Sequence, residues 1–116
     1  MLNKVKLMDS GTAMFRAESR EQAEEKLLDA LRLGGDKVTI EEDTYILDFS
    51  TWRYWQFIQA RLEPASFPCK WAAVLRTGDA PKLPFDLPSK QAVSLTKAIL
   101  KALGEWSPGI STTMRI

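Results

Sequence analysis

The sequence predicts a single α+β domain over residues 1–116: a mostly antiparallel sheet of about four to six strands with helices packed on it, in the order roughly ββαββαβα. Short runs that alternate polar and apolar residues indicate half-buried strands. Three longer segments with apolar residues three and four positions apart indicate amphipathic helices. A length of 116 residues, 45% of them hydrophobic and 27% charged, is typical of one globular domain.

The N-terminal segment is expected to form a β-hairpin. Val5 and Leu7 alternate with lysines, and the alternation resumes over residues 13–17. Between the two runs lies Asp9-Ser10-Gly11, which is a turn signal.

A first helix is expected over about residues 20–33. Ser19 is a suitable N-cap, and Gln22 three positions later completes a capping box. Gly34 and Gly35 then end the helix. The apolar residues at helical spacing, which form the expected buried stripe, are Ala23, Leu27, Ala30 and Leu31.

A second hairpin and a second helix are expected next. Residues 37–40 and 45–49 are rich in β-branched and aromatic side chains, and the acidic residues 41–43 form the turn between them. Ser50 is interpreted as the cap of a helix over about residues 51–62.

The C-terminal part begins with a strand over residues 71–76. A proline-rich connection over residues 81–88 follows, and its apolar side chains are expected to pin it to the core; these are Leu83, Phe85 and Leu87. The clearest helix spans about residues 89–103 and ends at Gly104. Its apolar stripe is Ala92, Leu95, Ile99, Ala102 and Leu103. Residues 110–116 form either a final strand or a frayed end.

The composition narrows the possible chemistry. The chain has no histidine, which excludes Ser-His and Cys-His nucleophile systems and removes the commonest zinc ligand. Cys69 is the sole cysteine and is interpreted as a small buried hydrophobe. The sequence therefore identifies no catalytic residue, no metal site and no cofactor, although an enzyme is left open.

The surroundings of the protein are inferred from what the sequence lacks. No apolar run exceeds five residues, far short of the roughly 20 that a membrane helix needs. The N-terminus has no apolar signal-peptide core. We therefore expect a cytoplasmic protein that does not bind membranes.

The aromatic segment around residues 52–62 carries the main functional prediction. On a helix, Trp55 would face the core together with Ile58 and Leu62, and aromatic side chains would also cover other parts of the circumference. Trp, Tyr and Arg dominate binding hot spots. The sequence thus predicts a non-catalytic module that binds itself, as a homodimer, or another protein. The predicted interface consists of Trp52, Arg53, Phe57 and Arg61.

Two alternatives belong to other functional classes. A small enzyme or ligand-binding domain would hold a pocket between the sheet and the second helix, with Asp48 and either Tyr45 or Tyr54 as its polar groups. A nucleic-acid-binding protein would instead use a lysine stripe, although a net charge of +1 is low for that class. The stripe consists of Lys82, Lys90, Lys97 and Lys101.

Overall fold

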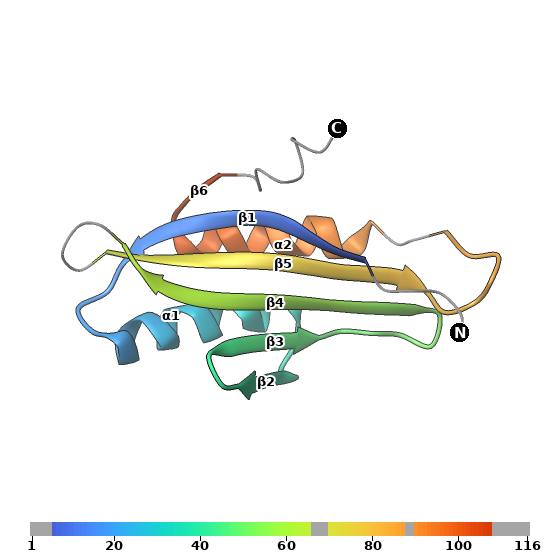
Figure 1. Ribbon diagram of the computed structural model, residues 1–116, viewed down its shortest axis with the longest axis horizontal. Coiled ribbons are helices and arrows are strands. Elements are labelled where there is room, and N and C mark those ends of the chain that lie inside the picture. The colour runs from blue at the N-terminus through green and yellow to red at the C-terminus, as the bar shows by residue number, and fades with distance from the viewer. Residues whose placement is uncertain (1–5, 66–69, 88–89, 108–116) are drawn as a thin grey trace.

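A computed structural model describes residues 6–65, 70–87 and 90–107 of the chain (Figure 1). Two predictions fall outside the described residues. They are the burial of Cys69 and the final strand or frayed end over residues 110–116. The elements are β1 (Lys6–Arg16), α1 (Arg20–Leu31), the 3₁₀ turn η1 (Arg32–Gly34), β2 (Val38–Glu41), β3 (Thr44–Asp48), β4 (Tyr54–Pro64), β5 (Lys70–Pro81), α2 (Gln91–Leu103) and β6 (Glu105–Ser107).

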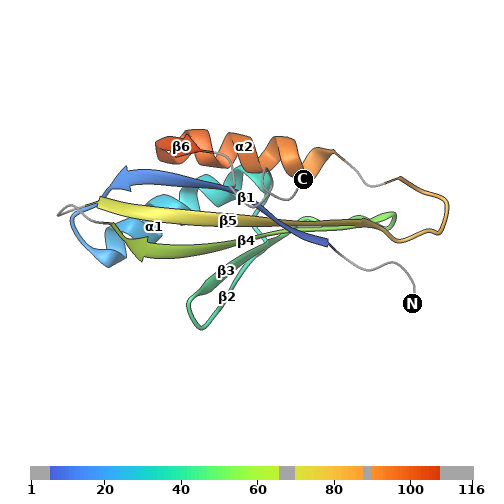
Figure 2. The same ribbon diagram turned by 45° about the horizontal axis from the view of Figure 1, so that its top comes forward.

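The strands form one six-stranded sheet in the order β2-β3-β4-β5-β1-β6, and all neighbours are antiparallel. Both helices lie on the same face of this sheet, and no helix of the described residues covers the other face (Figures 1 and 2). The α+β fold class is therefore confirmed. The observed element order, βαββββαβ, differs from the predicted one at three places: the N-terminal hairpin, the second helix, and the short strand β6 after the last helix, which was not predicted.

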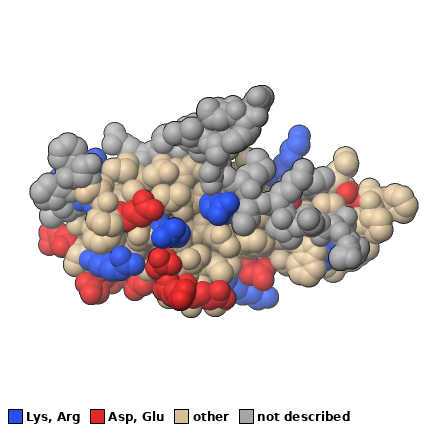
Figure 3. All heavy atoms as spheres, viewed as in Figure 1, with Lys and Arg blue, Asp and Glu red and all other residues tan. Residues whose placement is uncertain are grey.

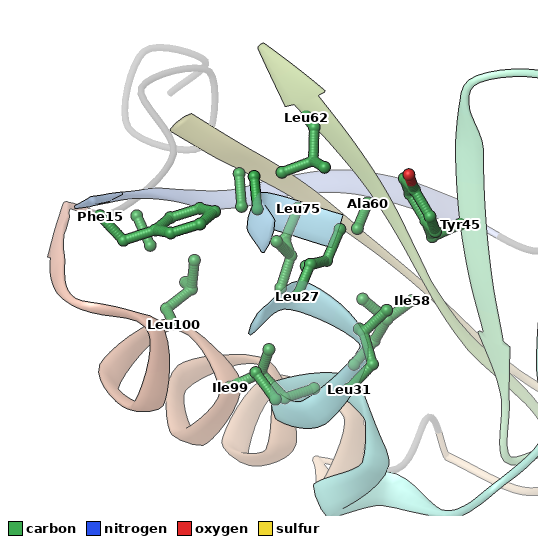
Figure 4. Packing of buried hydrophobic residues seen from close by; sticks show 14 of the residues in the cluster. Phe15, Leu27, Leu31, Tyr45, Ile58, Ala60, Leu62, Leu75, Ile99 and Leu100 are labelled. Atoms are coloured by element: carbon green, nitrogen blue, oxygen red, sulfur yellow. The ribbon is translucent and has the colours of Figure 1, made fainter. Parts of the chain in front are cut away.

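The core lies between the sheet and the two helices (Figure 4). Leu27 and Leu31 of α1 and Ile99 and Leu100 of α2 are completely buried. They meet inward-facing strand residues, which include Phe15, Tyr45, Leu47, Ile58 and Leu75. Burying each of these larger side chains contributes about 1.5–3 kcal/mol, so this layer dominates the stability of the fold.

The predicted N-terminal hairpin is wrong, because β1 is one continuous strand paired with β5. The register places Asp9 opposite Arg76 and Gly11 opposite Leu75, so that Ser10 is an extra residue in β1. A bulge of this kind absorbs a turn-like sequence without reversing the chain. Gly11 has a φ of 147°, a conformation that glycine adopts readily.

The first helix and its Ser19 N-cap are confirmed, but the return bond of the predicted capping box goes to Glu18 rather than to Ser19. The backbone N–H of Gln22 donates to Ser19 Oγ at 3.1 Å, and Gln22 Oε1 in return accepts from the N–H of Glu18 at 2.7 Å. The four apolar residues of the predicted stripe are the buried residues of α1.

The second hairpin is confirmed as β2 and β3, with Glu41 opposite Thr44 and Glu42 in the turn at a φ of 55°. The helix predicted after it is wrong, because residues 54–64 form strand β4 in the middle of the sheet. Positions 56, 58, 60 and 62 alternate inward and are buried, which is strand periodicity.

Ser50 closes the start of β4 instead of capping a helix. Its Oγ accepts from the backbone N–H of Gln56 at 3.0 Å and lies 3.2 Å from the carbonyl oxygen of the same residue. The serine hydroxyl thereby provides a hydrogen-bond partner for the backbone groups of Gln56 in strand β4.

The predicted strand over residues 71–76 lies within β5, and the predicted third helix is α2. The buried face of α2 is rotated from the predicted stripe, because it contains Thr96 and Leu100, whereas Ala102 is exposed. Thr96 tolerates burial because its hydroxyl lies 2.7 Å from the Ala92 carbonyl oxygen and 2.9 Å from the hydroxyl of Thr77. Neither α1 nor α2 has the length and apolarity needed to cross a bilayer.

Candidate binding surface

Two loops meet at one end of the sheet, where β4 begins and β5 ends. One loop joins β3 to β4 and contains residues 49–53, and the other follows β5 over residues 82–87. The register places Tyr54 opposite Pro81, which brings the two loops side by side. The backbone N–H of Lys82 donates to the carbonyl oxygen of Arg53 at 2.6 Å, so the sheet pairing continues into the loops.

An ion pair ties the loops together. Both Arg53 Nε and Arg53 Nη2 donate to the carboxylate of Asp86, the first at 3.1 Å. Hydrogen bonding from the guanidinium lowers the pKa of Asp86 below its ordinary value, which keeps the carboxylate charged. A bidentate arrangement fixes orientation as well as distance, so the two loops hold a defined relative position.

The first loop is itself a hydrogen-bonded turn. Thr51 Oγ1 accepts from the backbone N–H groups of Arg53 and Tyr54 at 3.2 and 3.1 Å. The N–H of Thr51 donates to the Tyr54 carbonyl oxygen at 2.9 Å. Trp52 lies within this turn and is 74% exposed.

Large apolar side chains gather on the two loops and the adjoining start of β4. We call this surface the aromatic tip; it consists of Trp52, Trp55, Leu83, Phe85 and Leu87. Phe85 is 97% exposed and Leu87 is 80% exposed, so the prediction that the proline-rich connection is pinned by its apolar side chains is wrong. The connection is held instead by the Arg53–Asp86 ion pair.

Cations cover part of the aromatic tip. Lys82 Nζ lies 4.3 Å from the ring centroid of Trp55, and the guanidinium carbon of Arg53 lies 5.6 Å from that of Trp52. Both distances fall within the range of cation–π attraction. In Figure 3, acidic side chains gather along the lower left of the molecule, whereas the described atoms at the right-hand end are mostly uncharged.

The structure divides the predicted protein interface. Trp52 and Arg53 lie at the aromatic tip, but Phe57 and Arg61 lie further along β4. Because β4 is a strand, they do not share a helix face, and they point to the face of the sheet opposite the helices. Arg61 forms an exposed ion pair with Asp43 at 3.3 Å and takes no part in the tip.

The predicted lysine stripe is also divided. Lys82 belongs to the aromatic tip, whereas Lys97 and Lys101 lie on the exposed face of α2, and Lys90 lies exposed just before that helix. Two lysines on the outer face of a helix are usual for a solvent-exposed helix, so they do not by themselves indicate a nucleic-acid site.

The pocket predicted between the sheet and a helix over residues 51–62 is not formed, because residues 54–64 are strand β4. Asp48 is exposed and accepts from the backbone N–H of Ser50 at 2.9 Å, and this bond lowers its pKa rather than raising it. Tyr45 is buried, and its hydroxyl donates to Glu24 Oε2 of α1 at 2.6 Å. Burial and the bond to Glu24 raise the pKa of Tyr45 to about 12. Both groups thus have structural partners.

A surface groove of about 440 Å³ lies where η1, the loop after β3 and α2 meet, and Phe49, Leu95 and Ser94 are among its lining residues. Among the residues that the structure describes, no titratable side chain lines it. Within residues 6–65, 70–87 and 90–107, no group of three or more Cys, Asp or Glu side chains is arranged to hold a metal ion.

Sequence reasoning missed the contribution of Leu83, Phe85, Asp86 and Leu87. The available signal was their position between Pro81, Pro84 and Pro88, because closely spaced prolines restrict the backbone and hinder apolar side chains from folding back onto the core. Comparisons with protein-family models, with curated proteins and with solved structures found no match to this chain.

Proposed function

We propose that this protein is a non-catalytic protein-binding module and that the aromatic tip is its docking surface. The observation that carries the proposal is the concentration of five exposed large apolar side chains at one end of the sheet, four on two loops that are fixed to each other and Trp55 at the adjoining start of β4. The other exposed large apolar residues of the described chain are Leu33, Ile40 and Val93, which lie on three separate elements. Exposed apolar side chains concentrated in one region commonly mark interaction sites.

The construction of the aromatic tip favours binding in a further way. Immobilising flexible side chains and loops on association costs free energy, about 0.5–1.5 kcal/mol for each rotamer-rich side chain. The Thr51 turn and the Arg53–Asp86 ion pair already order the loops before any partner arrives. This preorganisation leaves more of the apolar burial available as affinity.

The chemistry of the tip defines the partner. Trp52 and Phe85 require an apolar pocket, and the positive groups of Arg53 and Lys82 beside them favour carboxylates on its rim. We therefore expect a protein with an apolar cavity bordered by Asp or Glu side chains.

Affinity capture followed by reconstitution tests this proposal. Immobilised wild-type protein and the variants Phe85→Ser and Trp52→Ser are exposed to the same cell extract, and Leu33→Ser, which alters an exposed apolar residue away from the tip, is the matched control. A protein retained by the wild type and by Leu33→Ser, but lost with both tip variants, is then purified. Direct binding of the two purified proteins is the expected result.

Two results would contradict the proposal. One is retention of the same proteins by the wild type and all three variants, which would place any interface elsewhere. The other is tip-dependent binding to vesicles of anionic phospholipid with no protein retained, which would make the tip a membrane-docking surface.

A further inference from the structure

The edge of the described sheet at β2 lies apart from the aromatic tip. We propose that it binds a second copy of this chain, by antiparallel pairing of β2 with β2 of the other copy about a two-fold axis at Thr39. In the described sheet β2 has a neighbour on one side only, which is β3 (Figure 1). An edge strand presents unpaired backbone groups that are a template for another chain.

The backbone of β2 has the correct phase for this pairing. The N–H of Asp48 donates to the carbonyl oxygen of Lys37 at 3.1 Å. Alternate residues of an antiparallel strand bond to the same neighbour, so Thr39 also bonds to β3, whereas Val38 and Ile40 turn their backbone groups to the free edge. A two-fold axis at Thr39 places Val38 of one copy opposite Ile40 of the other.

Each copy then gains a hydrogen bond that the existing structure permits. The N–H of Val38 already donates to the Asp36 carbonyl oxygen at 3.0 Å. The carbonyl oxygen of Val38 remains directed to the edge, where the N–H of Ile40 from the second copy reaches it. The two-fold axis repeats this bond on the other side.

The side chains in the same register are complementary in charge. Lys37 of one copy lies opposite Glu41 of the other, and the axis generates this ion pair twice. Both residues are exposed in the single chain. Opposite charges directly across an antiparallel pair stabilise it, whereas like charges destabilise it. Self-pairing in this register therefore places a positive side chain opposite a negative one at both ends of β2.

The apolar residues of β2 support the same arrangement. Ile40 lies opposite Tyr45 and thus points to the helix face, yet it is 51% exposed. Val38 is half-buried and packs against the edge of the core. Pairing brings Val38 and Ile40 of both copies together into a cluster of four side chains, which covers surface that α1 and α2 leave open.

The geometry also defines the shape of the assembly. A two-fold axis perpendicular to the sheet keeps all helices on one face and makes one continuous sheet of both copies. The aromatic tips then point in opposite directions along the strands, and neither is covered. Since β2 has four residues, the interface is smaller than the roughly 1,200–2,000 Å² of standard stable complexes. The dimer should therefore be weak and should form as concentration rises.

Site-directed disulfide cross-linking tests the proposed register. In a Cys69→Ser background, which removes the native thiol, Thr39→Cys places two thiols across the axis. A pair of this type has Cα atoms about 4.5 Å apart, within the range of a disulfide. The matched variant Glu41→Cys places its two thiols about 13 Å apart along the strands. We expect rapid covalent dimer with Thr39→Cys at high concentration and little with Glu41→Cys.

Charge reversal gives an independent measurement. Sedimentation of Lys37→Glu and of Glu41→Lys should each show a dimer dissociation constant raised at least about tenfold, and the double exchange Lys37→Glu with Glu41→Lys should restore the wild-type value. Glu63→Lys, which makes the same charge change on β4, should have no effect. A strictly monomeric wild type at about 1 mM would overturn the inference. So would equal cross-linking at both cysteine positions, or a double exchange as weak as the single variants.

Discussion

The ring of Phe57 lies against Gly78 on the face of the sheet opposite α1 and α2. The two residues are directly opposite in the β4–β5 register. A Cβ atom placed on Gly78 would fall 2.5 Å from Phe57 Cε1 and Cζ, so the contact depends on the absent side chain. The aromatic ring covers backbone that would otherwise be exposed, an arrangement that compensates for glycine in a strand.

This contact predicts a background-dependent effect of Gly78→Ala. In the wild type the added methyl group displaces the ring, and we expect a loss of about 1–3 kcal/mol in the free energy of unfolding. With Phe57→Ala also present the methyl group has room, and alanine is better than glycine in a strand by about 0.5–1 kcal/mol, so the sign should reverse. Denaturant unfolding of the four proteins measures the coupling. An unchanged cost in the Phe57→Ala background would contradict this interpretation.

The buried Tyr45 hydroxyl predicts a loss of stability at high pH. Its pKa in the folded protein is about 12 against 10.0 ordinarily, so its ionisation opposes folding. The stabilising contribution of the neutral Tyr45 to the free energy of unfolding is complete below about pH 10. As the pH rises toward 12 the protein loses this contribution, which amounts to at most about 2–3 kcal/mol. Comparison of wild type with Tyr45→Phe isolates it, since lysines also titrate in this range. If the free energy of unfolding changed with pH in the same way for the two proteins, Tyr45 would not contribute to the loss of stability at high pH.

The Arg53–Asp86 pair predicts a local rather than a global effect. Asp86→Asn should leave the unfolding transition almost unchanged, because the pair lies at the surface, but the amide of Lys82 should exchange hydrogen faster. Asp29→Asn removes another exposed ion pair, with Arg32, and should leave the Lys82 amide unaffected. Because the pKa of Asp86 is lowered, the same loosening should occur in the wild type only as the pH falls below the ordinary carboxyl value. Equal exchange in both variants would contradict a tethering role.

The buried, unpaired side-chain amide of Gln56 predicts that an apolar residue at this position stabilises the protein. Its side chain is 1% exposed, and neither amide atom has a hydrogen-bond partner. Burial of an unpaired amide costs about 1–3 kcal/mol, so Gln56→Met should raise the free energy of unfolding by about 1 kcal/mol. Gln59→Met, on the opposite face of β4, is the control and should stay within about ±0.5 kcal/mol. A destabilised Gln56→Met would show that the amide is satisfied in solution.

The elements predicted correctly are those with complete local signals. The Ser19 N-cap fixes the start of α1, and the acidic turn fixes the β2–β3 hairpin. The prediction for β4 was wrong because its residues fit both the helical period of 3.6 and the strand period of 2. Trp55 falls into helical spacing with Ile58 and Leu62, and the polar Gln56 hides the alternation. Pairing with β5 along its whole length decides for a strand, and that pairing is not visible locally.

The candidate site was half predicted for a related reason. Composition predicted Trp52 and Arg53 as candidate interface residues, and both are exposed in the structure. Their association with Phe85 and Leu87 comes from the sheet register, which joins segments about 33 residues apart through Arg53 and Asp86. Sequence patterns alone report no such distant contact.

The most direct test of the central claim is the dissociation constant between this protein and the captured partner, measured by calorimetry with purified proteins. We predict that Phe85→Ser raises it by at least about 30-fold, equivalent to about 2 kcal/mol for an aromatic anchor, while thermal unfolding stays unchanged. Leu33→Ser should bind as the wild type does. Equal affinity of Phe85→Ser and wild type would contradict the assignment of the aromatic tip as the docking surface.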